Sequence, residues 1–404
     1  HLYITARLDY SVAVFERNAT NGQITYQDRY GVASGVSGLT GAAGVAVEPN
    51  EARVLVTGGT DDALVSFDRN TTTGLLTHHE TIVDGQGGLD RMDFPSDAAV
   101  SPDGNHVYVT ARNDYSISVF VRDNLTGQLS RTQVVEDSDA TVDGLRGPRS
   151  ITVSPDGHHV YVTAEHDDAI TVFSRDSSTG HLTFVETLNR YQVGVEGMDR
   201  PLAVLVAPDG RHVYVTGQYD DSLVVFRRDQ ATGQLTFVEA SYDGVDGVDG
   251  LNGAYGLAAS PEGDHVYVAG SYDYSLNVYN RDPVSGSLSF VERERDGYNG
   301  VDGLSYVNSV KVSSDGRHVY AISYSALTVF ERDLATGELS FLEVHKQNVD
   351  GVEGLSLACS VVVSEDGADV YVGDWYGGAV TRFRRDTATG RLTFIETYES
   401  GSAE

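Results

Sequence analysis

Residues 150–186 read SITVSPDGHHVYVTAEHDDAITVFSRDSSTGHLTFVE, and this stretch decides the fold. It contains four short runs rich in valine, isoleucine, threonine, tyrosine and phenylalanine, the residue types that favour β-strands. Ser-Pro-Asp-Gly, Glu-His-Asp-Asp and Asp-Ser-Ser-Thr-Gly separate the runs and are typical turn sequences. None of the runs has the period of an amphipathic helix. We therefore predict a unit of four antiparallel strands joined by tight turns.

The HVYVT segment of this unit recurs along the whole chain. Related segments begin near residues 1, 53, 106, 159, 212, 265, 318 and 369, so successive repeats are 51 to 53 residues apart. A repeat of this length indicates a solenoid, a propeller or an array. One four-stranded unit cannot bury both of its faces, and a stack of units that closes on itself removes the exposed strand edges. We therefore predict an all-β fold, a β-propeller of four-stranded antiparallel blades.

The two ends of the chain decide the number of blades. Seven innermost strands are predicted, near Val45, Ala98, Ile151, Val204, Leu257, Val310 and Val361, but the other three strands occur eight times. We expect eight blades, the first without its inner strand, in a single domain over residues 1–404. Seven blades with an N-terminal three-stranded flap are the alternative. Because the sequence begins at His1 and not at a methionine, we expect that a preceding segment has been removed.

The composition restricts the partners and the location of the protein. The chain has 59 acidic and 28 basic residues, a net charge of −31, and lysine only at Lys311 and Lys346. Such a charge repels phosphate, so nucleic acid is excluded as a partner. No apolar stretch of about 18 residues occurs, and no transmembrane segment is expected. Acid-rich, lysine-poor surfaces suit saline surroundings. We expect an extracellular or cell-surface protein, with the periplasm as the alternative, from a marine or halophilic bacterium.

Two sets of positions on one face of the predicted propeller differ from blade to blade, although the strands around them hardly change. The first set precedes the inner strands and contains Ala43, Ser96, Arg149, Leu202, Tyr255, Asn308 and Cys359. The second set ends the second strands and contains Arg7, Gly59, Arg112, Glu165, Gln218, Ser271, Tyr324 and Trp375. Because the fold does not dictate these residues, we predict a ligand pocket lined by Arg7, Arg112, Arg149, Glu165, Gln218, Tyr255, Asn308, Tyr324, Trp375 and Tyr376. A merely solvated rim is the alternative, and the lone cysteine, Cys359, is expected to be buried and inert.

Acidic and aromatic residues follow the second strands, as in Asp114-Tyr115 and Tyr272-Asp273-Tyr274. Sugars are often held by aromatic faces beside carboxylates, and this pattern favours a glycan, a small ligand or a protein as the partner. The alternative is structural, because aspartate caps loops and tyrosine covers the seam between blades.

The loops before the inner strands are rich in Asp-Gly, most of all DGVDGVDGLNG at 243–253. Asp243, Asp246 and Asp249 are candidate ligands for Ca²⁺, because calcium prefers oxygen ligands. Ordinary glycine-rich turns explain the same sequence without a metal, so calcium remains a hypothesis.

The repeat core SPDG-x-HVYVT-x-x-x-D-x-x-x-VF-x-RD-x-x-TG-x-L resembles the Tyr-Val-Thr-Asn repeat propellers, which are related to the lactonase propeller family. That family places a Pro-Arg-His segment before an inner strand and a glutamate after the next strand. Pro148, Arg149 and Glu165 match these places, whereas Ser150 stands where the family has histidine. The resemblance implies that Arg149 binds an acidic substrate or an oxyanion and that Glu165 moves a proton. An Arg149–Glu165 ion pair that only stabilises the rim is the alternative.

Three functions follow from these observations. The main prediction is a secreted or cell-surface binding module, not an enzyme, that holds its ligand on the acidic, aromatic face, and the other two are alternatives. The second is a lactonase-like hydrolase or isomerase that uses Arg149 and Glu165 as catalytic residues. The third is a structural unit of a surface assembly.

Overall fold

The computed structural model describes residues 1–6, 10–18, 24–48, 52–87, 89–123, 125–137, 142–364, 366–374 and 379–399. These residues contain 31 strands and one 3₁₀ turn, η1 (Val32–Ser34). The strands form one three-stranded and seven four-stranded antiparallel sheets. The predicted β-propeller of eight blades, the first without its inner strand, is confirmed. Within the described ranges, no helix has the length and apolar character needed to cross a membrane.

The chain divides into two compact units, each with four blades. The first unit comprises His1–Asn189 and Asp229–Gln234. Its blades are β1 (Leu2–Ala6), β2 (Ser11–Arg17) and β3 (Ile24–Gly31); β4 (Ala42–Val47), β5 (Arg53–Gly58), β6 (Ala63–Arg69) and β7 (Leu76–Val83); β8 (Pro95–Val100), β9 (His106–Ala111), β10 (Ser116–Arg122) and β11 (Leu129–Glu136); and β12 (Pro148–Val153), β13 (His159–Ala164), β14 (Ala169–Arg175) and β15 (Leu182–Asn189).

The second unit comprises Arg190–Arg228 and Leu235–Glu404. Its blades are β16 (Pro201–Val206), β17 (His212–Gly217), β18 (Ser222–Arg228) and β19 (Leu235–Tyr242); β20 (Ala254–Ala259), β21 (His265–Gly270), β22 (Ser275–Arg281) and β23 (Leu288–Arg295); β24 (Ser309–Val312), β25 (His318–Ser323), β26 (Ala326–Arg332) and β27 (Leu339–Lys346); and β28 (Ala358–Val363), β29 (Asp369–Asp374), β30 (Ala379–Arg385) and β31 (Leu392–Glu399).

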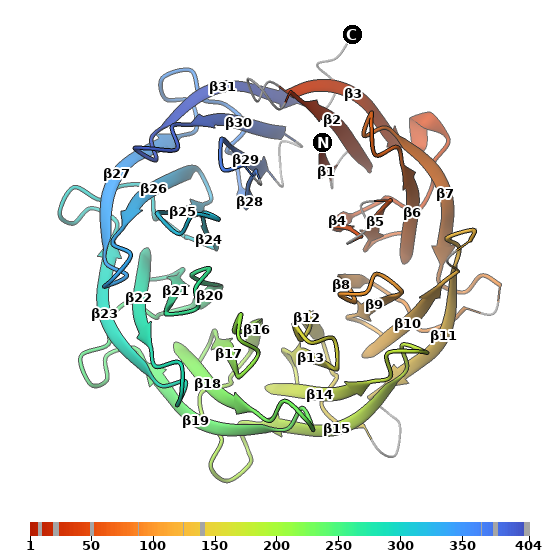
Figure 1. Ribbon diagram of the computed structural model, residues 1–404, viewed down its shortest axis with the longest axis horizontal. Coiled ribbons are helices and arrows are strands. Elements are labelled where there is room, and N and C mark those ends of the chain that lie inside the picture. The colour runs from red at the N-terminus through yellow and green to blue at the C-terminus, as the bar shows by residue number, and fades with distance from the viewer. Residues whose placement is uncertain are drawn as a thin grey trace. The chain divides into compact units, whose positions relative to one another are not determined.

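The strands of each blade follow one another across the sheet in chain order, as from β12 to β15 (Figure 1). Within each unit the first strands of consecutive blades contact one another, β4 with β8 and β8 with β12 in the first unit, and β16 with β20 and β20 with β24 in the second. Every predicted inner strand contains the residue at which it was predicted.

The second strand of a blade is buried on both faces, which explains why HVYVT does not alternate between apolar and charged residues. In β9, Val107 and Val109 pack with Leu55 of the second blade, while Tyr108 packs with Val162 of the fourth blade. Successive side chains of a strand point to opposite faces. Each blade therefore contributes to two neighbouring cores.

Arg175, at the end of β14, joins the third and fourth blades. Its Nε donates to the Tyr108 hydroxyl and its Nη1 to the Gly157 carbonyl, each at 2.8 Å. Its Nη2 lies 2.6 Å from Asp103 Oδ2 and 2.7 Å from His106 Nδ1. Burial, with this guanidinium, lowers the pKa of His106 and keeps the imidazole neutral. The second unit repeats the arrangement at Arg281, Arg332 and Arg385.

The Asp-x-x-Thr-Gly turn fits against the same seam. Asp176 Oδ1 accepts hydrogen bonds from the Ser178 and Thr179 N–H groups, at 2.8 and 2.9 Å. Gly180 has φ +73°, and a Cβ there would lie 2.1 Å from the His106 ring. Only glycine suits a left-handed residue in this space. The recurring glycine is therefore set by packing between blades.

Candidate active site

A β-bulge interrupts the start of the inner strands. In β12, Pro148 lies opposite Ala164 and Ser150 opposite Thr163, so Arg149 is the extra residue. The Thr163 hydroxyl accepts the Ser150 N–H at 3.2 Å, which satisfies a donor that the bulge displaces. Bulges re-aim side chains and often occur next to active sites.

The bulge also explains the first set of variable positions. Register shifts occur at the inner-strand starts that contain Ala43, Ser96, Arg149, Leu202, Tyr255 and Cys359. Cys359 is exposed, so the expectation of a buried thiol was wrong. A residue in a bulge leaves the alternation that would otherwise bury every second side chain.

The second set of variable positions begins directly after the second strands. The Glu165 N–H donates to Gly147 O at 3.0 Å, and the Arg112 N–H donates to Phe94 O at the same distance. Gln218 and Ser271 are buried at the corresponding places of the second unit. These backbone hydrogen bonds therefore fix the positions of the Glu165 and Arg112 backbones.

Glu165 is a buried carboxylate that pairs with Arg112. Arg112 Nε lies 2.5 Å from Glu165 Oε1, and Arg112 Nη2 contacts the same oxygen. The Glu165 side chain is 1% exposed and that of Arg112 is 30% exposed. His166 Nε2 lies 3.9 Å from this oxygen. The sequence predicted a pair between Glu165 and Arg149. The contact of Glu165 with Arg112 of the preceding blade was not predicted.

Asp97 belongs to the same region and was missed in the sequence. Its Oδ2 accepts the Ile151 N–H at 3.1 Å, across the seam between the third and fourth blades. Burial raises the pKa of this carboxyl to about 6, although hydrogen bonds and the Arg149 guanidinium oppose the increase. The Ser150 hydroxyl is one of the groups bound to it. Ser150, which replaces the histidine of the family, therefore contacts a carboxylate poised near neutral pH.

Asp97 directly follows Ser96, a member of the first set of variable positions, and it also departs from the repeat. The corresponding residues of the other blades are Gly44, Ser150, Ala203, Gly256, Ser309 and Ser360. A carboxylate at a place otherwise held by small residues is not required by the fold.

The remaining predicted pocket residues are placed as follows. Gln218 Nε2 lies 3.5 Å from the Tyr272 hydroxyl, and Asn308 Nδ2 donates to Ala358 O at 3.1 Å, both in the second unit. Tyr255 is half-buried at its bulge. Arg7, Trp375 and Tyr376 lie outside the described residues.

Tyr324 belongs to an aromatic cluster in the second unit. Its ring stacks on Tyr306, with centroids 5.5 Å apart and an angle of 17° between planes. Tyr274 meets Tyr306 edge-on at 4.9 Å. Tyr306 and Tyr324 are 40% and 47% exposed. Tyr306 has φ 56°, a left-handed conformation that is costly for a bulky residue.

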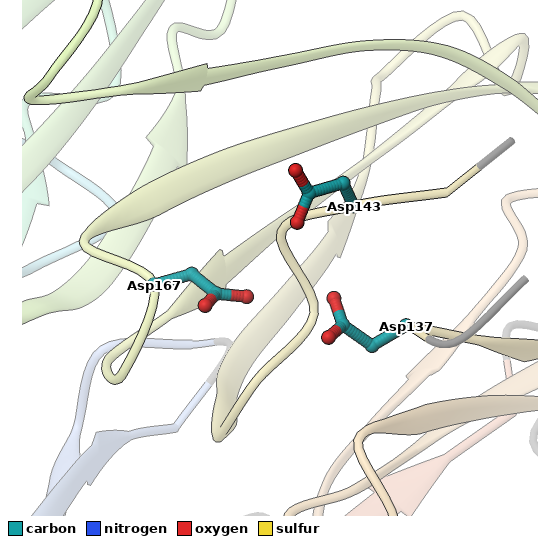
Figure 2. A group of neighbouring side chains, drawn as sticks. All are labelled: Asp137, Asp143 and Asp167. Atoms are coloured by element: carbon teal, nitrogen blue, oxygen red, sulfur yellow. The ribbon is translucent and has the colours of Figure 1, made fainter. Parts of the chain in front are cut away.

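Each of two groups of three aspartates takes two residues from the loop before an inner strand and one from the turn after a second strand. Carboxylate oxygens of Asp137, Asp143 and Asp167 lie within 4.8 Å of one another (Figure 2). Asp137 Oδ1 already accepts the N–H groups of Gly144 and Leu145, so this residue also shapes its loop. Burial raises the pKa of Asp167, and Asp137 and Asp143 raise it further.

The second group contains two of the three predicted calcium ligands. Asp243 and Asp249 meet Asp273, and Asp246 is not a member. Arg293 forms an ion pair with Asp249. Thr187 stands at the position of Arg293 in the first group, where its hydroxyl contacts the Asp143 carbonyl. In the first group the Arg146 guanidinium acts on Asp167 instead.

Comparison with known proteins identifies relatives over most of the chain. The family model described as "Lactonase, 7-bladed beta-propeller" matches residues 1–142, 133–307 and 309–404. The chain is 22% identical over 293 residues to a 6-phosphogluconolactonase of Pectobacterium carotovorum, covering 72% of this chain and 81% of that protein. It is 24% identical over 288 residues to a 6-phosphogluconolactonase of Klebsiella pneumoniae, covering 71% and 80%. The solved periplasmic gluconolactonase PpgL of Pseudomonas aeruginosa is 19% identical, with a TM-score of 0.61 and coverage of 84% and 93%, and shares the fold.

Proposed function

Because the chain belongs to the lactonase family of β-propellers, we propose that it hydrolyses the lactone of a sugar acid at the group of Asp97, Arg112, Arg149 and Glu165. The observation that carries this proposal is Asp97, a carboxylate held beside Arg149 at the seam of two blades. The relatives named 6-phosphogluconolactonase support this substrate class. Two arginines at one site of a chain with net charge −31 favour a substrate that carries or develops negative charge.

Asp97 is the general base in the proposed reaction. Its carboxylate removes a proton from water, whose oxygen attacks the carbonyl carbon of the lactone. The Arg149 guanidinium donates hydrogen bonds to the oxyanion that develops. The ring C–O bond then breaks, and the ring oxygen takes the proton from Asp97 and becomes a hydroxyl group. The new carboxylic acid loses its proton to water. Ser150 and the Ile151 N–H hold the Asp97 carboxylate during both transfers.

Glu165 is assigned a positioning role. A buried carboxylate in close contact with a guanidinium is already committed as a hydrogen-bond acceptor. Glu165 therefore orients Arg112, whose partly exposed guanidinium binds an anionic substituent of the substrate. This assignment differs from the expectation that Glu165 itself moves the proton.

The proposal is tested with glucono-1,5-lactone and its 6-phosphate, by acid release in weakly buffered solution. The wild type should exceed spontaneous ring opening, and Asp97→Asn should lower kcat by about 10²–10⁴-fold. The value of kcat/KM should fall as pH drops below about 6, because Asp97 becomes protonated. Asp264→Asn, in an exposed turn, is the matched control. No acceleration at any pH would contradict the proposal, and full activity of Asp97→Asn would contradict the role of Asp97.

A second candidate function, glycan binding, is favoured by the Tyr274, Tyr306 and Tyr324 cluster. Exposed tyrosine rings offer flat apolar faces to the C–H groups of a sugar ring. Tyr306 takes a left-handed position that glycine occupies in three other blades (Gly41, Gly147 and Gly253) and that Phe94, Arg200 and Leu357 occupy in three more. The exposure of the Tyr306 and Tyr324 rings supports this second function.

A further inference from the structure

Lys311 lines a cavity of about 420 Å³ along the inner strands of the second unit. The described residues that line it are mostly apolar or small, and Lys311 is the only charged residue among them. Leu205, Leu257, Val310 and Val312 contribute apolar side chains. The volume is within the range of small-molecule sites, and such sites combine apolar walls with few polar groups.

The fold does not require a charge at this position. Lys311 lies opposite Tyr320 in the register of β24 and β25. The residues at the same place in the other complete blades are uncharged: Ala46, Ala99, Thr152, Leu205, Ala258 and Val362. Lysine is also rare in this chain, which has only one other. The lysine is therefore a departure from the repeat in a chain that otherwise uses arginine.

Lys311 has no carboxylate within ion-pair distance among the residues that the structure describes, although the chain carries 59 acidic residues. The other lysine, Lys346, lies 2.5 Å from Asp302 Oδ1. Lys311 is exposed, so its ammonium group is open to an anion from solution, and the apolar walls favour an anion that brings its own apolar part. A polyanion would leave negative charge unpaired in the same space.

We propose that this cavity binds a monocarboxylate with a short apolar chain. The chain packs against Leu205, Leu257 and Val310, and the carboxylate accepts a hydrogen bond from Lys311 Nζ. The cavity belongs to the second unit, whereas Asp97, Arg112, Arg149 and Glu165 belong to the first. The proposal therefore stands whether or not the chain hydrolyses lactones.

Isothermal titration calorimetry with octanoate tests this site. The wild type should bind octanoate saturably with one site, and Lys311→Met, which keeps an apolar stem, should weaken binding about tenfold or more, as loss of a charge-assisted hydrogen bond implies. Lys346→Met should leave binding unchanged. The neutral analogue 1-octanol should bind the wild type and Lys311→Met alike.

The same variants provide the outcomes that would overturn the proposal. Lys311→Ala installs the side chain that Ala99 and Ala258 provide in sister blades, so it should fold and should also lose octanoate binding. If the wild type shows no saturable binding of octanoate, or if both Lys311 variants bind it as the wild type does, the cavity is not a carboxylate site.

Discussion

Removal of the Arg175 side chain should destabilise the protein by about 3 kcal/mol. In Arg175→Leu, the Gly157 carbonyl and His106 Nδ1 each lose the hydrogen bond from Arg175, and the Tyr108 hydroxyl keeps only its bond to the Gly180 carbonyl. Each lost hydrogen bond costs about 1 kcal/mol. The fourth partner, Asp103, is 36% exposed and can be solvated instead, so its ion pair adds little. The sum is at the lower end of the 3–5 kcal/mol typical of a broken buried pair.

Urea unfolding followed by far-ultraviolet circular dichroism measures this loss. Arg391→Ala is the matched control, because the Arg391 side chain is 59% exposed and its pair with Glu343 spans 3.1 Å at the surface. The control should stay within about 0.5 kcal/mol of the wild type. A loss of about 3 kcal/mol is large against a typical stability of 5–15 kcal/mol. If Arg175→Leu and Arg391→Ala unfold at the same urea concentration, the interblade role of Arg175 is refuted.

Acid should destabilise the fold in two steps. The first comes from His106: because burial lowers the pKa of its imidazole, its contribution to the free energy of unfolding is present above the unfolded pKa of about 6.5 and is lost as the pH falls below that value. The second step comes from Asp103: its pKa is lowered to about 2, so its contribution to stability is lost between about pH 4 and 2. A series of thermal unfolding measurements from pH 8 to 2 should show both steps. Unchanged stability between pH 7 and 5 would contradict the His106 step. Calcium at millimolar concentration and constant ionic strength should raise the unfolding temperature, because an ion that binds only the folded protein stabilises it by mass action, and Asp143→Asn should abolish the increase. If the unfolding temperature is the same with calcium and with chelator, the calcium hypothesis is wrong. A glycan array identifies a bound glycan, and titration then measures its affinity. Tyr324→Ala should weaken this binding by about 1–3 kcal/mol, and Tyr306→Gly should weaken it without loss of stability. If neither variant changes binding, the tyrosine cluster is not the glycan site.

The fold could be predicted from the sequence because local and long-range signals agree. The number of repeats sets the number of blades, and the turn sequences set the strand ends. The packing explains why the signal is so regular: His106, Tyr108, Arg175 and Gly180 all meet at one seam, so each repeat must supply the same partners to its neighbour. Residues that hold blades together therefore recur, and residues that depart from the repeat are free to serve a site.

The order of residues within one repeat does not show which of the residues that depart from the repeat contact one another. Arg149 and Glu165 lie in one repeat and were predicted as a pair, but the contact of Glu165 with Arg112, 53 residues earlier, was not predicted. Asp97 reaches the Ile151 N–H, 54 residues later. Inner strands of neighbouring blades lie side by side, so positions one repeat apart become neighbours at the loop face. Comparison of each departing residue with those 52 to 54 positions away would have found both pairs.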